Sequence, residues 1–123
     1  LGARRVGLVS PYVESVASPV RAALEGAGLA VPETLSFGEE AEARVARIDP
    51  ASILEAVLEV GARPGLDAVF VSCTNLRALE IVETAEARLG LPVITSNTAL
   101  AWQMFAQAGA RPAAAPGRLF GGA

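Results

Sequence analysis

The fold is decided by one stretch, Asp67-Ala-Val-Phe-Val-Ser-Cys-Thr-Asn-Leu-Arg77. Its apolar run at 68–71 is β-branched and aromatic, which suits a strand covered on both faces, as in a parallel sheet. The small polar residues that follow end this strand, and Thr74 or Asn75 is expected to cap a new helix. Apolar residues then recur near helical spacing, with charged residues between them. The pattern predicts strand, turn and helix in direct succession, with the single cysteine, Cys73, at the turn.

This position gives Cys73 two possible roles. Ligands bind at the carboxyl edge of open α/β sheets, and the partial positive charge of a helix N-terminus favours a thiolate. A free cysteine is also often just a small buried hydrophobe. Position alone leaves the catalytic and the structural interpretation roughly even.

The alternation of strand and helix extends along the whole chain. Strands are predicted at 5–10, 29–37, 68–71 and 92–95, the second nearer an edge because Pro32 interrupts it. Capping pairs predict helix starts at Ser18-Pro19, Asp49-Pro50, Thr74-Asn75 and Ser96-Asn97. Residues 13–17 are expected to form a loop, with or without one turn of helix, and residues 38–48 to hold a short exposed helix. This order predicts an α/β fold: a four-stranded parallel sheet with right-handed crossovers and helices on both faces.

The domain organisation is expected to be simple. Residues 1–109 are predicted to form a single α/β domain, and the Ala/Pro/Gly-rich residues 110–123 a loose tail.

The composition excludes several kinds of chemistry. The 123 residues include no histidine and no lysine, so this chain holds no Ser-His-Asp triad, Schiff-base lysine or Walker A loop. No metal site is expected, and a net charge of −3 without a basic patch argues against nucleic acid as a partner. No apolar run is long enough to span a membrane. A single cysteine forms no internal disulfide, which favours a reducing compartment, the cytoplasm.

The ends of strands one, three and four are expected to bring polar side chains to one edge of the sheet. The candidate substrate-binding residues around Cys73 are Ser10, Tyr12, Thr74, Asn75, Ser96 and Asn97. Hydroxyls, a phenol, amides and helix N-termini suit a small anion such as a carboxylate. Taken singly, several of these residues are better explained as helix caps, and Tyr12 as a half-buried aromatic. Their joint arrival at one edge favours a binding site.

Three segments of the chain together resemble the aspartate/glutamate racemase superfamily. They are Arg5-Val-Gly-Leu-Val-Ser-Pro-Tyr12, Val71-Ser-Cys-Thr-Asn-Leu-Arg77 and Pro92-Val-Ile-Thr-Ser-Asn-Thr-Ala-Leu-Ala-Trp102. The resemblance spans residues 4 to 109. The nearest branch comprises maleate cis-trans isomerases, arylmalonate decarboxylases and ectoine-utilisation proteins, with the last as the best match.

This resemblance implies one half of a two-domain, flavodoxin-like enzyme without cofactor or metal. The chain resembles the second domain, so Cys73 is expected to be the proton donor or acceptor there. Tyr12 and the backbone N–H of Thr74 are expected to bind the carboxylate of a small substrate. An N-terminal domain or a second chain would complete the site, and a homo-oligomer is expected.

Two departures from the family pattern bear on the substrate. Isomerases often have an asparagine near Glu42, and an acid there would repel a second substrate carboxylate. Decarboxylases tend to have glycines after the cysteine, where this chain has Thr74 and Asn75.

Two alternatives to an enzyme remain open at this point. One is a binding domain that holds a small anion while Cys73 stays inert. The other is a structural half-domain that pairs with another copy or another chain, which apolar exposure of the helix at 100–105 would favour.

Overall fold

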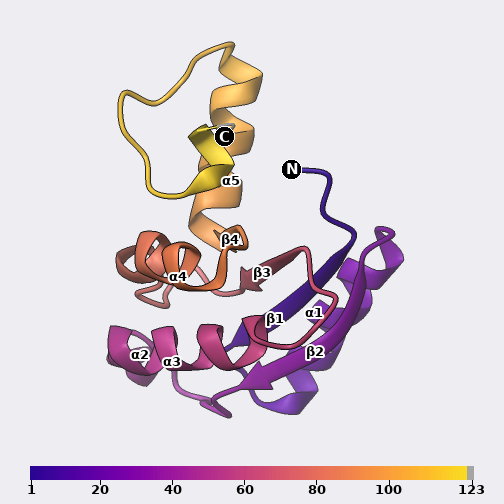
Figure 1. The fold of residues 1–123 in the computed structure, drawn as a ribbon. Helices are drawn as coiled ribbons and strands as arrows, with labels where there is room; N and C mark the ends of the chain where they lie inside the picture. Colours follow the sequence, from indigo (N-terminus) through magenta and orange to yellow (C-terminus); the bar gives the residue numbers. More distant parts are fainter. Residues whose placement is uncertain (122–123) are drawn as a thin grey trace.

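The computed structural model describes residues 1–121 and confirms the α/β architecture (Figure 1). The strands are β1 (Arg5–Ser10), β2 (Ala30–Ser36), β3 (Ala68–Val71) and β4 (Val93–Thr95). The helices are α1 (Glu14–Gly26), α2 (Glu42–Val45), α3 (Pro50–Gly61), α4 (Val82–Leu89), α5 (Ser96–Ala108) and α6 (Arg118–Gly121), and a 3-10 helix, η1 (Leu79–Ile81), leads into α4.

All strand pairings in the sheet are parallel, in the order β2-β1-β3-β4. The prediction that Pro32 places its strand at an edge is therefore confirmed. The register of β1 against β2 shifts by one residue between the pairs Arg5↔Ala30 and Gly7↔Glu33. Such an irregularity lets one strand change the face that it buries, and it sits beside the proline that cannot donate to the ladder.

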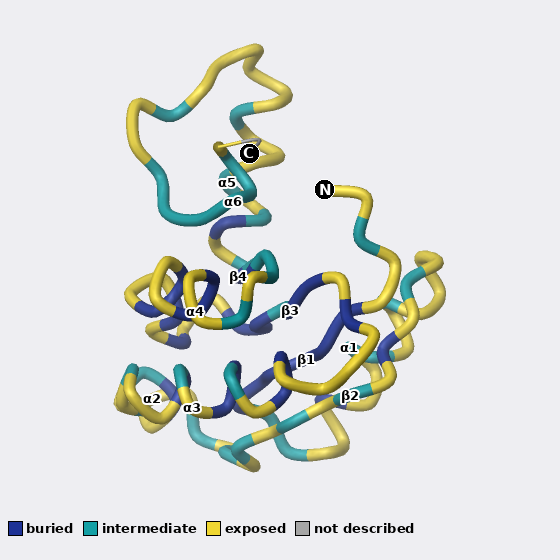
Figure 2. Tube along the Cα trace, in the orientation of Figure 1, coloured by how far each residue is buried: buried dark blue, intermediate teal, exposed yellow. Residues whose placement is uncertain are grey.

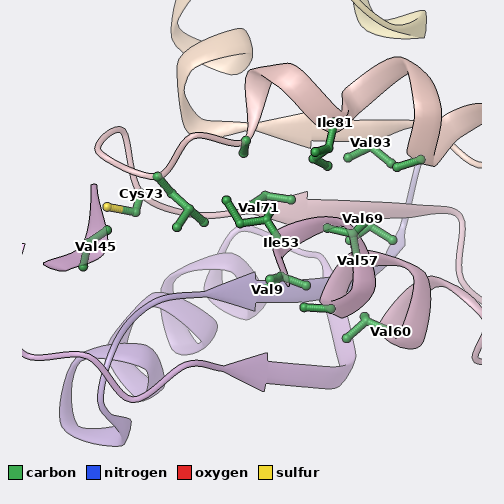
Figure 3. Packing of buried hydrophobic residues seen from close by; sticks show 14 of the residues in the cluster. Val9, Val45, Ile53, Val57, Val60, Val69, Val71, Cys73, Ile81 and Val93 are labelled. Atoms are coloured by element: carbon green, nitrogen blue, oxygen red, sulfur yellow. The ribbon is translucent and has the colours of Figure 1, made fainter. Parts of the chain in front are cut away.

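Helices cover both faces of the sheet, as predicted, but unequally. Helices α3 and α4 enclose the larger core, in which Ile53 and Val57 pack against Val9, Val69 and other strand residues (Figure 3). The other face carries α1 over β1 and β2. There Phe70 and Ile94, on β3 and β4, stay only partly buried. The second face is thus covered over one half only.

The close packing of α3 against β1 depends on Gly7. A Cβ atom built there would collide with the side chain of Val60 on α3. Glycine in the middle of a strand costs some stability, so its presence here is explained by the closeness of α3 to β1.

Helix α1 begins at Glu14, five residues before Pro19, the predicted first position. Backbone N–H groups of Val16 and Ala17 bond to the carbonyl oxygen of Val13, and Ala17 is buried by this extra turn. Pro19 lies inside the helix rather than at its first position. Pro19 has no N–H for a helix hydrogen bond, which destabilises the helix. The hydrogen-bonded first turn and the burial of Ala17 offset this loss.

Helix α5 and the segment after it stand away from the sheet (Figures 1 and 2). Helix α5 has a single buried residue, Thr98. Its exposed residues include three large apolar side chains: Leu100, Trp102 and Met104. Phe120 on α6 meets Phe105 edge to face, with ring centroids 6.4 Å apart.

The expectation of a loose tail is wrong for residues 118–121. They form α6, and the backbone N–H of Arg118 donates to the carboxylate of Glu86 at 2.9 Å. Residues 122–123 lie outside the described part of the chain. Among residues 1–121, no helix combines the length and apolarity that crossing a membrane requires.

Candidate functional site

Cys73 has an unusual backbone conformation at the carboxyl end of β3. Its φ angle is 110°, and it is the one non-glycine residue of the described chain with a positive φ. A side chain in this region costs about 1–3 kcal/mol and persists only where surrounding contacts hold it. Because such strain gathers at active sites, the conformation itself points to function.

The chain turns after Cys73 instead of opening a helix. Residues 74–76 form a turn that buries Leu76, and helical structure resumes at η1. The prediction that Thr74 or Asn75 caps a helix is therefore wrong, because the positive φ redirects the backbone at that point. Helix α4 begins only at Val82, so no α-helix starts directly after Cys73.

Side chains at the start of α5 hold this turn in place. The hydroxyl of Ser96 accepts a hydrogen bond from the backbone N–H of Cys73 at 3.0 Å. The side-chain amide of Asn97 donates to the carbonyl oxygen of Thr74, also at 3.0 Å. Ser96 and Asn97 were predicted as caps, but Thr95 caps α5 in a reciprocal capping box with Thr98.

The thiol of Cys73 is almost enclosed. The residue is 8% exposed and belongs to the larger core cluster, together with Val45 of α2. Figure 3 shows the sulfur pointing towards Val45 rather than into the sheet. The short helix α2 thus lies across the thiol, a neighbour that the polar composition of residues 38–48 did not reveal.

Tyr12 lies on the same edge, beside the Cys73 turn, and is half-buried. Burial raises the pKa of its phenol above the ordinary value, the Ser72 hydroxyl lowers it, and Cys73 and Glu42 raise it further. The net effect keeps Tyr12 protonated over the neutral range, as a hydrogen-bond donor.

Among the other predicted site residues, some side chains bond to protein atoms, whereas two backbone N–H groups have no protein partner within the described chain. Asn75 donates its side-chain amide to Glu42, at 2.8 Å to the carbonyl oxygen and 3.1 Å to the carboxylate. The hydroxyl of Ser10 pairs with that of Ser36 on β2 at 2.9 Å. Within residues 1–121, the backbone N–H groups of Thr74 and Asn75 donate to no protein acceptor. These two groups are therefore available to an anion.

A cavity of about 270 Å³ opens beside Tyr12 at this edge. Its lining combines apolar and acidic side chains: Tyr12, Val13, Val16, Glu39, Glu40, Glu42 and Val45. Nowhere in the described residues do three or more acidic, cysteine or histidine side chains gather as a metal site would require.

Fold and edge together define the class: the parallel sheet with Cys73 beyond β3 is an Asp/Glu racemase-like α/β unit, as the resemblance implied. The chain belongs more particularly to the arylmalonate decarboxylase family, because the family model of that description matches residues 1–120.

Individual relatives agree with this family. Arylmalonate decarboxylase of Bordetella bronchiseptica is 34% identical over 123 residues, covering 98% of this chain and 51% of that protein. A crystal structure of arylmalonate decarboxylase superposes with a TM-score of 0.86 at 32% identity, covering 100% of this chain and 55% of that one. The structure of a Nocardia farcinica maleate cis-trans isomerase variant with a covalently bound succinylcysteine intermediate superposes with a TM-score of 0.89 at 29% identity. The match covers 96% of this chain and 49% of that one. The chain spans about half the length of the curated relatives it matches.

Proposed function

We propose that this chain is one half of a cofactor-independent enzyme that isomerises, racemises or cleaves small carboxylates, with Cys73 as the catalytic acid/base. The observation that carries the proposal is the φ angle of 110° at Cys73, held by Ser96 from a different strand–helix junction. A cysteine that served only to fill the core would gain nothing from this strain.

Proton transfer next to a carboxylate is the step that this geometry suits. As a thiolate, Cys73 would accept a proton from the carbon beside the substrate carboxylate, and the electron pair would move towards that carboxylate. As a thiol, it would return a proton to the same carbon. Thiols suit both directions, because environment can tune their acidity towards neutrality.

Substrate binding is assigned to donors beside the thiol. The protonated phenol of Tyr12 and the free backbone N–H of Thr74 would bind the substrate carboxylate. The predicted ligands Ser96, Asn97 and Asn75 would act indirectly instead, because their side chains hold the turn and α2. Ser10 would support β2 rather than the substrate.

A second α/β half, on the same chain or on another, would complete the site. The chain spans about half of its relatives, and two apolar surfaces lack a cover within the described residues: the exposed side of α5 and the β3–β4 half of one sheet face. We also propose that the protein forms a homo-oligomer in a reducing, cytoplasmic environment. Within the family, we propose that it is most similar to the ectoine-utilisation proteins.

The test compares wild type and Cys73→Ser in a protein that contains both halves, against a panel of arylmalonates, maleate and monocarboxylates that carry a neutral or cationic second group. The variant should lose about 10²–10⁴-fold in turnover, the usual contribution of a positioned acid/base. Ser52→Ala, an exposed change on α3, serves as the control and should keep full activity. Unchanged turnover in Cys73→Ser would refute the catalytic role and leave an anion-binding or structural half.

A further inference from the structure

We propose that Glu42 determines specificity at the Cys73 site, so that the substrate is a monocarboxylate whose second group is neutral or cationic. The substrate class rests on the proposed function. The charge selection itself is a property of the site and is measurable without turnover.

The position of Glu42 follows from two contacts that join α2 to the Cys73 turn. Asn75, two residues beyond Cys73, donates to the carboxylate of Glu42 at 3.1 Å and to its carbonyl oxygen at 2.8 Å. Val45, one helical turn after Glu42, packs against Cys73, and the sulfur points towards it (Figure 3). Glu42 is thereby fixed at the end of α2 that borders the turn.

Glu42 and the thiol of Cys73 both lie near Tyr12. Glu42 and Tyr12 both line the cavity of about 270 Å³ at this edge. After the larger effects of burial and of the Ser72 hydroxyl, both Cys73 and Glu42 raise the pKa of Tyr12. Groups that act electrostatically on one phenol lie close enough to act on a ligand bound beside it.

The charge of Glu42 is not cancelled by a neighbour. Within residues 1–121, no arginine nitrogen lies within bonding range of its carboxylate, whereas Glu39 pairs with Arg44 at 3.7 Å. Asn75 orients the Glu42 carboxylate but brings no positive charge. A ligand at the thiol therefore meets a fixed negative charge on the α2 side, which disfavours an anionic group and favours a neutral or cationic one.

The measurement uses the rate at which small reagents alkylate Cys73, which is the single thiol of the chain. Neutral iodoacetamide and anionic iodoacetate differ mainly in charge. The iodoacetamide rate divided by the iodoacetate rate gives one ratio for Cys73 and one for free 2-mercaptoethanol. The first ratio divided by the second is the normalised ratio, which reports the charge selectivity of the site. Any general change in the exposure or reactivity of the thiol affects both reagents and cancels in this ratio.

Wild type should prefer iodoacetamide, and Glu42→Gln should lower the normalised ratio about three- to tenfold, as expected for one nearby unit charge. Glu42→Asp keeps the charge and should keep most of the preference. The control is Glu83→Gln on α4, which changes the net charge equally and should leave the ratio unchanged. Added salt should weaken the wild-type preference.

Equal ratios in wild type and Glu42→Gln would overturn the proposal, and so would a shift of the same size in Glu83→Gln. Failure of both reagents to reach Cys73 would also overturn it, because a closed site selects nothing. None of these results depends on turnover, so they are separate from a failure of Cys73→Ser to abolish activity.

Discussion

The exits of β3 and β4 lie side by side at one edge of the sheet, but they are built differently. At the end of β4 the backbone is regular. The Thr95 hydroxyl caps α5 by accepting from the N–H of Thr98, and the Thr98 hydroxyl accepts from the N–H of Thr95. At the end of β3 the backbone takes a positive φ at Cys73, and no helix forms until η1. The regular exit stabilises its own helix, whereas the irregular exit depends on Ser96 and Asn97 of its neighbour.

This difference shows how a strained turn can persist. The reciprocal capping box makes the start of α5 rigid, and that rigid start presents acceptor and donor groups to the Cys73 turn. Strained conformations need such outside support. The two exits are therefore coupled, and weakening the regular one should disturb the irregular one.

The largest effect is expected from Thr98→Val, which removes the hydroxyl that accepts from the buried N–H of Thr95 at 2.9 Å. Leaving that donor without a partner should lower the free energy of unfolding by about 1–3 kcal/mol. Urea unfolding measures the change. Thr84→Val, the same substitution at an exposed site on α4, is the matched control. Equal losses in both variants would contradict the role given to the capping box.

A smaller effect is expected from Ser96→Ala, which deprives the N–H of Cys73 of its acceptor but leaves the α5 cap intact. Unfolding free energy should fall by about 1 kcal/mol. In the two-half protein, turnover should fall as well, because the thiol loses its fixed position. Normal turnover together with reduced stability would show that this bond supports the fold without positioning the thiol.

Much of the fold could be predicted from the sequence because the relevant signals are local. Short β-branched runs placed the strands, and Asp49 before Pro50 correctly marked the start of α3, where its carboxylate accepts from the N–H of Ala51. Pro32 correctly indicated an edge strand.

The failures occurred where distant residues decide the outcome. Thr74-Asn75 and Ser96-Asn97 carry similar capping chemistry, but the first pair enters a turn because groups more than 20 residues away hold it there. Glu86 is a charged residue on α4, yet it is only 5% exposed. Its carboxylate accepts from the N–H groups of Val93 and Arg118, contacts that no local pattern announces.

Of the candidate site, the sequence placed Cys73 and Tyr12 together at the correct edge. It did not reveal that α2 lies over the thiol, because a run of charged residues predicts an exposed helix and gives no sign of its partner. Nor could it reveal the φ angle of Cys73, since this residue type carries no preference for the left-handed region.

Strain at Cys73 is the property on which the functional assignment depends, and comparing Cys73→Gly with Cys73→Ala tests it most directly. Both variants remove the thiol, so they differ only in the Cβ atom, which is strained at this φ. With φ at 110°, glycine should be more stable than alanine by about 1 kcal/mol or more in urea unfolding. At an unstrained position glycine is instead less stable by about 0.5–1 kcal/mol. An alanine variant as stable as the glycine variant, or more so, would mean that the turn carries no strain and would contradict the central claim.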